Sequence, residues 1–246
     1  MLINFGPYLK PRFLLISALG LAVIYVLMSQ ISTIKSEPSF AIAGTYTHDK
    51  VIALTFDLDN GDRVISAILD ALKAHNTKAS FFITGMYVSR HPEPIQRILA
   101  EGHEIGYKWA DSKDSAKFSP EQMFTDLDKS HTVLKKFTGI EPSLIRPGDS
   151  NFSRESLKIA DQLGYKTISW NVDSKDLETV SPDCLISQVG SALKPGAIIL
   201  MHASDRAIIT SRSLPALLES IKSSGYQVVT VGELLQKHSE KGLARY

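Results

Sequence analysis

The chain has 246 residues, of which 43% are hydrophobic, and this length allows an N-terminal segment plus one α/β domain of about 200 residues with a full core. Its 27 basic and 26 acidic residues give a net charge of +1, which excludes a strong electrostatic field toward nucleic acid. The only cysteine, Cys184, excludes an internal disulfide, so the fold must depend on its core.

The first predicted element is a membrane-spanning helix. Residues 13–32, FLLISALGLAVIYVLMSQIS, contain no charge, and their helical length matches a hydrocarbon core of about 30 Å. Lys10 and Arg12 precede this run, so the positive-inside rule puts residues 1–12 in the cytoplasm and the rest of the chain outside. We therefore predict a transmembrane signal anchor that holds a domain on the extracytoplasmic side.

Residues 33–48 contain Ser, Thr, Pro and Gly and are predicted to form a linker, with the domain proper over residues 49–246. The competing interpretation is a cleaved signal peptide, because residues 41–43, Ala-Ile-Ala, have the small-x-small form of a cleavage site. The domain would then be secreted. The separation of this tripeptide from the apolar run favours the uncleaved anchor.

From residue 51 onward, short apolar runs alternate with helical patterns, which is typical of βα units around a parallel sheet. Amphipathic spacing or capping residues predict helices over 62–75, 94–101 and 119–137. About seven βα units are expected, and periodicity alone leaves a barrel and an open doubly wound sheet as alternatives. The predicted strands cover residues 51–57, 78–83, 104–107, 143–145, 166–170, 197–201 and 227–231.

Polar residues follow several of these strands. Catalytic groups in parallel α/β folds lie at the C-terminal ends of the strands, where the loops converge. Each polar residue, taken singly, is also explained as a helix cap or a solvated loop charge. Taken together they predict a functional site on one face of the domain, made from Asp57, Lys108, Arg146, Asp173, Asp176 and His202.

The same segments resemble the motifs of the polysaccharide deacetylase (NodB-homology) family. The resemblance covers residues 51–235 and implies a distorted (β/α) barrel and the hydrolysis of an N-acetyl group from an aminosugar polymer. It rests on residues 51–57 (VIALTFD), 77–85 (TKASFFITG), 102–106 (GHEIG), 146–147 (RP), 170–176 (WNVDSKD) and 198–202 (IILMH).

Catalytic roles follow from this resemblance. It implies that Asp57 is the base, that Arg146 orients it, and that His202 is the acid, held protonated by Asp173 or Asp176. These roles suit the chemistry, because a carboxylate near a cation stays ionised and an imidazole near a carboxylate stays charged.

Substrate contacts are predicted at three positions next to the matching motifs, namely Trp109, Pro147 and Trp170. An exposed aromatic ring stacks well on a sugar face. For Trp109, packing against its own loop is the alternative.

The metal-binding half of the motif set differs from the family pattern. The family's zinc-ligand positions read Leu58, Lys108 and Ser112, which are an apolar group, an ammonium without a lone pair and a weakly binding hydroxyl. Asp59 is the one remaining, weak, candidate ligand, because alternate residues of an extended chain share a face with Asp57.

The charged residues allow two further arrangements. In the first, the Lys108 ammonium pairs with Asp57 and Asp59 and replaces the neutralising charge of the metal; the alternative is a solvated loop lysine. In the second, Asp59, His103 and His202 hold a metal ion together.

The sequence therefore predicts a membrane-anchored, cell-surface protein that recognises N-acetylated glycan such as peptidoglycan or a chitin-like polymer. Hydrolysis of the acetamide is expected to be weakened or lost, with no cofactor and no nucleic-acid partner. The alternative is an active deacetylase that uses a zinc-type divalent metal with unusual ligands. The presence of Asp57, Arg146 and His202 argues for this alternative.

Overall fold

The computed structural model describes residues 39–109, 119–148, 153–237 and 242–245. The predicted membrane anchor at residues 13–32 and the motif residue Ser112 lie outside these ranges. Within these ranges, no helix is both long enough and apolar enough to cross a bilayer.

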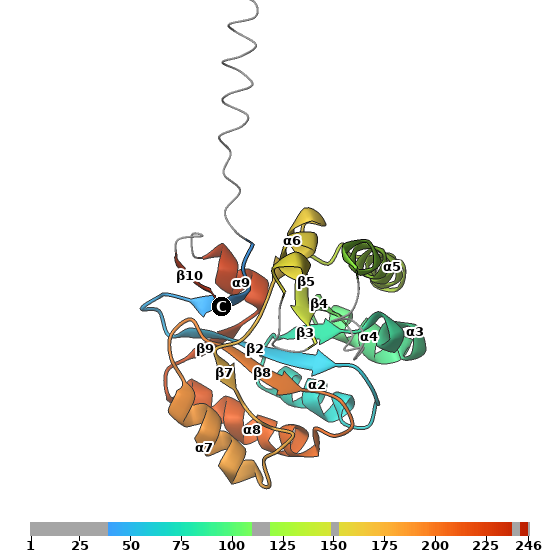
Figure 1. The fold of residues 1–246 in the computed structure, drawn as a ribbon. Helices are drawn as coiled ribbons and strands as arrows, with labels where there is room; N and C mark the ends of the chain where they lie inside the picture. Colours follow the sequence, from blue (N-terminus) through green and yellow to red (C-terminus); the bar gives the residue numbers. More distant parts are fainter. Residues whose placement is uncertain (1–38, 110–118, 149–152, 238–241, 246) are drawn as a thin grey trace, which may run out of the picture. The chain divides into compact units, whose positions relative to one another are not determined.

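The centre of the domain is a curled, parallel sheet surrounded by helices, which is consistent with a distorted (β/α) barrel (Figure 1). The strand order is β6-β5-β4-β3-β2-β8-β7, and β9 pairs with the first half of β2. All seven predicted strands are present in this sheet, which also contains one additional short strand, β7. The strands are β2 (Val51–Leu58), β3 (Ser80–Ile83), β4 (Glu104–Trp109), β5 (Leu144–Pro147), β6 (Lys166–Thr167), β7 (Val172–Asp173), β8 (Ile198–His202) and β9 (Gln227–Val229).

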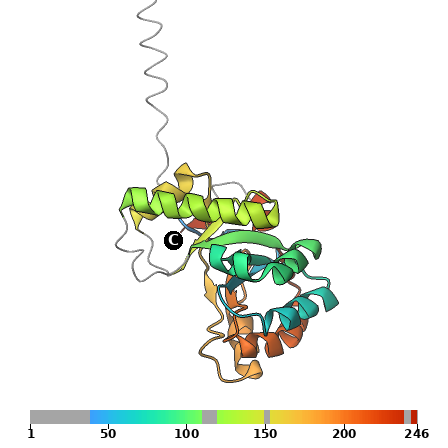
Figure 2. The same ribbon diagram turned by 90° about the vertical axis from the view of Figure 1, so that its right-hand side faces the viewer.

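The helices lie mostly along the outside of the curled sheet, as the two views show together (Figures 1 and 2). The helix start predicted at residue 119 is confirmed. Ser119 forms a capping box there, because its side chain accepts from the backbone N–H of Gln122 while the Gln122 side chain accepts from the Ser119 N–H. The helices are α2 (Ile65–Ala74), α3 (Gly85–Arg90), α4 (Pro92–Ala100), α5 (Pro120–Thr138), α6 (Arg154–Gln162), α7 (Pro182–Ala192), α8 (Ile208–Ser223) and α9 (Val231–Gln236).

The alternation of side chains along each strand divides the core in two. In β2, Leu54, Phe56 and Leu58 join the large apolar cluster that the outer helices cover. Val51 and Ala53 point the other way and join a smaller cluster inside the curl. Asp57 is an even number of residues after Val51 and Ala53, so its side chain points to the same inner face. The alternation of side chains along β2 therefore determines which polar groups reach the interior of the half-barrel.

The smaller cluster is closed by a two-stranded antiparallel ribbon of β1 (Ile42–Thr45) and β10 (Leu243–Arg245), together with α9. Ile42 is buried there and forms a parallel bridge with Ile168. The prediction of a linker over residues 33–48 is therefore wrong for residues 42–45. The reason is that their small and apolar side chains bury against the open side of the sheet rather than remaining in solvent.

Candidate functional site

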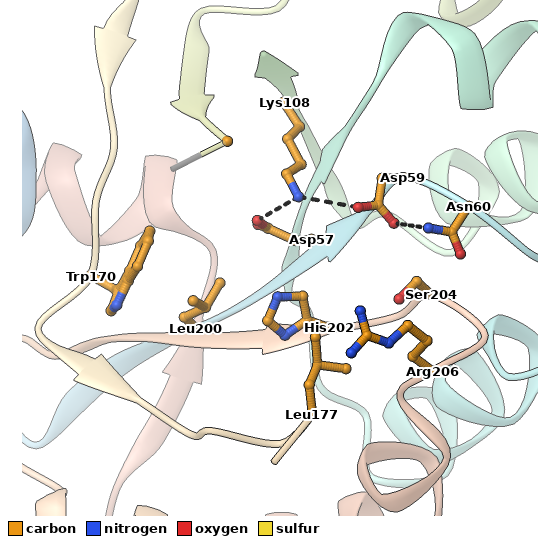
Figure 3. Close-up of a pocket in the computed structure, with 11 residues that line it drawn as sticks. Asp57, Asp59, Asn60, Lys108, Trp170, Leu177, Leu200, His202, Ser204 and Arg206 are labelled. Atoms are coloured by element: carbon orange, nitrogen blue, oxygen red, sulfur yellow. Dashed lines mark hydrogen bonds and ion pairs between the residues drawn. The ribbon is translucent and has the colours of Figure 1, made fainter. Parts of the chain in front are cut away.

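Three of the polar residues predicted at strand ends, Asp57, Lys108 and His202, line one pocket of about 380 Å³ at the carboxyl ends of β2, β4 and β8 (Figure 3). This is the position that the parallel fold predicts for a functional site. Its lining combines paired charges with an apolar wall, and it consists of Asp57, Asp59, Asn60, Lys108, Gly148, Trp170, Leu177, Leu200, His202, Ser204 and Arg206.

Asp57 forms a buried ion pair with Arg146, whose side chain points from β5 into the interior of the curled sheet. The Arg146 Nη1 atom lies 2.9 Å from Asp57 Oδ1 and 2.9 Å from Thr55 Oγ1. The remaining guanidinium donors face backbone carbonyls, at 3.4 Å from Ile168 and 3.3 Å from Ser169. A fully buried arginine is tolerated because its donors are satisfied in this way.

The guanidinium group of Arg146 also makes cation–π contacts with two aromatic rings. Its central carbon lies 4.0 Å from the Phe82 ring centroid and 5.5 Å from that of Trp170. Such contacts favour the cation over solvent. They also fix the Trp170 ring beside the pocket that it lines.

Lys108 reaches the same carboxylate from the other side. Its Nζ lies 3.2 Å from Asp57 Oδ2 and 3.4 Å from Asp59 Oδ2, and only 6% of its side chain is exposed. Asp59 is held in place by a 2.8 Å hydrogen bond from Asn60. The geometry agrees with the hypothesis that Lys108 neutralises the two carboxylates, and it is incompatible with a solvated loop lysine.

Two cations acting on Asp57 shift its pKa downward. Burial opposes the charged form and acts to raise the pKa, but the charges of Arg146 and then of Lys108 outweigh burial. Asp57 is therefore an ionised carboxylate with a low proton affinity.

His202, the last residue of β8, is paired with Asp176. The distance from His202 Nδ1 to Asp176 Oδ1 is 2.8 Å, and Asp176 Oδ2 accepts from the His202 backbone N–H at 2.7 Å and from Thr210 Oγ1 at 2.5 Å. Burial acts to lower the pKa of His202, but the hydrogen bond and charge of Asp176 raise it above the ordinary value. The ring is thus biased toward the imidazolium form.

The structure selects Asp176 over Asp173 as the partner of this histidine. Asp173 is exposed, and its Oδ1 accepts from the backbone N–H of Lys175 in the turn after β7. Lys175 has φ of 49°, and this turn directs Asp176 back into the interior. The sequence left the two aspartates as alternatives because turn geometry decides between them.

Two of the predicted substrate contacts do not reach the pocket. Trp109 is only 5% exposed, lies in the outer core, and donates from Nε1 to Asp126 Oδ2 on α5 at 2.9 Å. Pro147 is buried and follows Arg146 by one residue, so it faces away from the interior. Trp170 does line the pocket.

The residues at this site do not fit a divalent metal ion. Leu58 points into the outer apolar core, on the face opposite Asp57, and Lys108 brings a donor-only ammonium against both carboxylates. Within the ranges that the structure describes, no three His, Cys, Asp or Glu side chains are grouped to share an ion. Asp59 lies in the pocket, but as a partner of Lys108.

The arrangement that would use His103 is also wrong. His103 lies in the turn before β4, where its Nδ1 accepts from the Ala79 backbone N–H at 3.2 Å and burial lowers its pKa. The five residues from there to Lys108 span about 16 Å of extended chain. His103 therefore cannot share an ion with Asp59 and His202 at the other end of the sheet.

Two hydroxyl residues that support the site, Thr55 and Thr210, are not predicted by the sequence analysis. Thr55 could have been found, because it is two residues before Asp57 on the same strand and so shares its face. Thr210 gave no local signal, since it reaches Asp176 from the start of α8 only after folding.

A model of the polysaccharide deacetylase family matches residues 44–168, just over half of the chain. The chain belongs to the polysaccharide deacetylase family. A peptidoglycan-N-acetylglucosamine deacetylase of Bacillus cereus is 32% identical over 196 residues, covering 78% of this chain and 91% of that relative. PgdA of Listeria monocytogenes, also a peptidoglycan-N-acetylglucosamine deacetylase, is 33% identical over 186 residues. That match covers 76% of this chain, which spans only 39% of PgdA.

Among solved structures of this family, the chain is similar to BA3943 of Bacillus anthracis, described as a CE4 family pseudoenzyme. The TM-score is 0.74 with 28% sequence identity, and the alignment covers 80% of this chain and 69% of that one. A BA3943 mutant described as having restored enzymatic activity aligns with the same TM-score. The polysaccharide deacetylase fold thus occurs in proteins described as active and in one described as inactive.

Proposed function

We propose that this polysaccharide deacetylase-like protein binds N-acetylated glycan of the cell wall, such as peptidoglycan, and that its hydrolysis of the acetamide is weak or lost. The observation that carries the proposal is the contact between Lys108 Nζ and Asp57 Oδ2 at 3.2 Å. The ammonium supplies the positive charge that two neighbouring carboxylates need, and it leaves no set of donors for zinc.

The lowered pKa of Asp57 supports reduced catalysis. A general base works best with a pKa near the operating pH, whereas Arg146 and Lys108 hold the pKa of Asp57 below its usual value. Such a carboxylate is a poor acceptor for the proton of an attacking water. It remains a good hydrogen-bond acceptor for a sugar hydroxyl or an amide N–H.

The rest of the pocket suits a sugar. Trp170, Leu177 and Leu200 provide an apolar side on which a pyranose ring can rest, and His202 and Asn60 provide polar groups around it. The relatives named as peptidoglycan deacetylases support an N-acetylated cell-wall polymer as the ligand. We further propose that residues 13–32 anchor the domain to the membrane on the extracytoplasmic side, beside this polymer.

The second candidate is an active N-deacetylase that uses a divalent metal. The Asp57–Arg146 and His202–Asp176 pairs favour it, since a base and an acid with their orienting partners remain in place. The two candidates differ in what they require at Lys108.

Acetate release and glycan binding by the full-length chain separate the candidates. We expect N-acetylglucosamine oligomers to bind in the absence of added metal, and acetate release to stay at background after zinc, cobalt or nickel is added. Metal-stimulated acetate release that Asp57→Asn abolishes would establish the active enzyme instead. Equal glycan binding by wild type and a Trp170→Ala variant would remove this pocket as the binding site.

A further inference from the structure

One cation in the pocket has no partner within the described ranges. Arg206 lines the pocket from the loop after β8, and it makes no hydrogen bond, ion pair or ring contact with any residue that the structure describes. Its neighbour Asp205 is engaged elsewhere, because Asp205 Oδ1 accepts from the Arg63 backbone N–H at 2.8 Å. In Figure 3, Arg206 and Trp170 are drawn on opposite sides of the pocket.

The carboxylates around the pocket, by contrast, are already satisfied. Asp57 has Arg146 and Lys108, Asp59 has Lys108 and a neighbouring amide, and Asp176 has His202. Among the described side chains that line the pocket, Arg206 is therefore the cation that is available to receive an anionic group on a ligand.

A second donor stands next to Arg206. Ser204 is only 4% exposed and lines the same pocket, and its hydroxyl has no hydrogen-bond partner among the residues that the structure describes. Ser204 and Arg206 both line the pocket from the loop that follows β8 (Figure 3). A hydroxyl and a planar guanidinium two residues apart on one loop match the two oxygens of a carboxylate.

We propose that Arg206 and Ser204 form a carboxylate subsite, which makes this pocket select an N-acetyl sugar that carries a carboxylate over its uncharged counterpart. The inference rests on the proposed function, because it assumes that the pocket binds N-acetylated glycan. It adds the chemical class of the sugar. The apolar wall at Trp170 holds the ring, and the opposite rim at Arg206 holds the acid group.

N-acetylmuramic acid and N-acetylglucosamine form a suitable pair of probes, since they differ only by the lactyl ether that bears a carboxylate. We expect the full-length chain, studied by isothermal titration calorimetry, to bind the methyl glycoside of N-acetylmuramic acid about tenfold more tightly, as a charge-assisted hydrogen bond to a guanidinium provides. Arg206→Gln should abolish this preference, so that the two sugars bind the variant with equal affinity. Ser204→Ala should reduce the preference. The matched control is Arg212→Gln, which changes an exposed arginine of α8 that does not line the pocket and should leave both affinities as in the wild type.

Two additional probes identify the source of the carboxylate. The amide of N-acetylmuramic acid retains the lactyl bulk without the charge, and N-acetylmuramoyl dipeptide carries its free carboxylate on the peptide. If the amide binds as tightly as the acid, the subsite recognises shape and the proposal is overturned. Tight binding of the dipeptide would assign the carboxylate to a peptide stem, whereas weak binding would assign it to the sugar.

Failure of this inference is distinguishable from failure of the proposed function. Equal affinity for all four probes in wild type overturns the carboxylate subsite while glycan binding stands. Binding of none of the probes overturns the proposed function, and the subsite with it.

Discussion

Replacing Lys108 with methionine is expected to destabilise the protein strongly. The substitution keeps the length of the side chain but removes the ammonium from a site where the lysine and Asp57 side chains are only 6% and 5% exposed. Breaking a buried ion pair by removing one partner costs about 3–5 kcal/mol, because the other charge stays buried. Arg146 remains on Asp57 Oδ1, so we place the cost near the lower end, at about 3 kcal/mol. For a domain of this size that lowers Tm by about 6–12 °C.

The assay is urea and thermal unfolding of wild type and variant, with Lys73→Met as the matched control. Lys73 is 71% exposed and lies 3.8 Å from Glu101, so its loss should cost no more than about 0.5 kcal/mol. Adding Asp57→Asn to Lys108→Met should cost less than the sum of the single variants, because it removes the stranded charge. A Lys108→Met variant as stable as Lys73→Met would refute the ion-pair reasoning.

Asp176→Asn should lower the pKa of the His202 imidazole toward or below its ordinary value of about 6.5, as followed by NMR, because Asp176 is what raises it. The raised pKa of His202 in the folded state contributes stability that is fully present below about pH 6.5 and is lost as the pH rises through that folded-state pKa. The Asp176→Asn variant should therefore be more destabilised, relative to wild type, at pH 6 than at pH 9. An equal loss of stability at both pH values would contradict the pairing of His202 with Asp176. Trp170→Ala should weaken glycan binding, while Trp109→Phe should lower stability by about 1–3 kcal/mol through loss of its bond to a carboxylate and leave binding unchanged. Ser119→Ala should cost about 1 kcal/mol in urea unfolding, by loss of the α5 capping box, and a neutral result would argue against that cap.

The strands and the inward polar positions could be predicted from the sequence because both depend on local patterns. Apolar runs mark the strands, and a two-residue period carries Thr55, Asp57 and Asp59 along one side of β2. The same two-residue period explains why two of the predicted substrate contacts are wrong. Trp109 and Pro147 each stand one residue after an inward-facing cation, so the pleat turns them to the outer core.

Loop residues were less predictable, for a physical reason. Which aspartate meets His202 depends on the turn at Lys175, and the partner hydroxyl of Thr210 arrives from a helix more than thirty residues away. Short stretches with small apolar side chains are ambiguous in a similar way. Residues 42–45 have the composition of a linker, and only the open inner side of the sheet makes them a strand.

Metal binding is the strictest test of the pairing of Lys108 with Asp57 and Asp59. The purified full-length chain, equilibrated with zinc, cobalt or nickel and then separated from free ion, should carry far less than one equivalent of metal, because the ammonium competes for the carboxylates that would bind it. Wild type and Asp57→Asn should give the same value. One tightly held equivalent in wild type that disappears in Asp57→Asn would contradict the account.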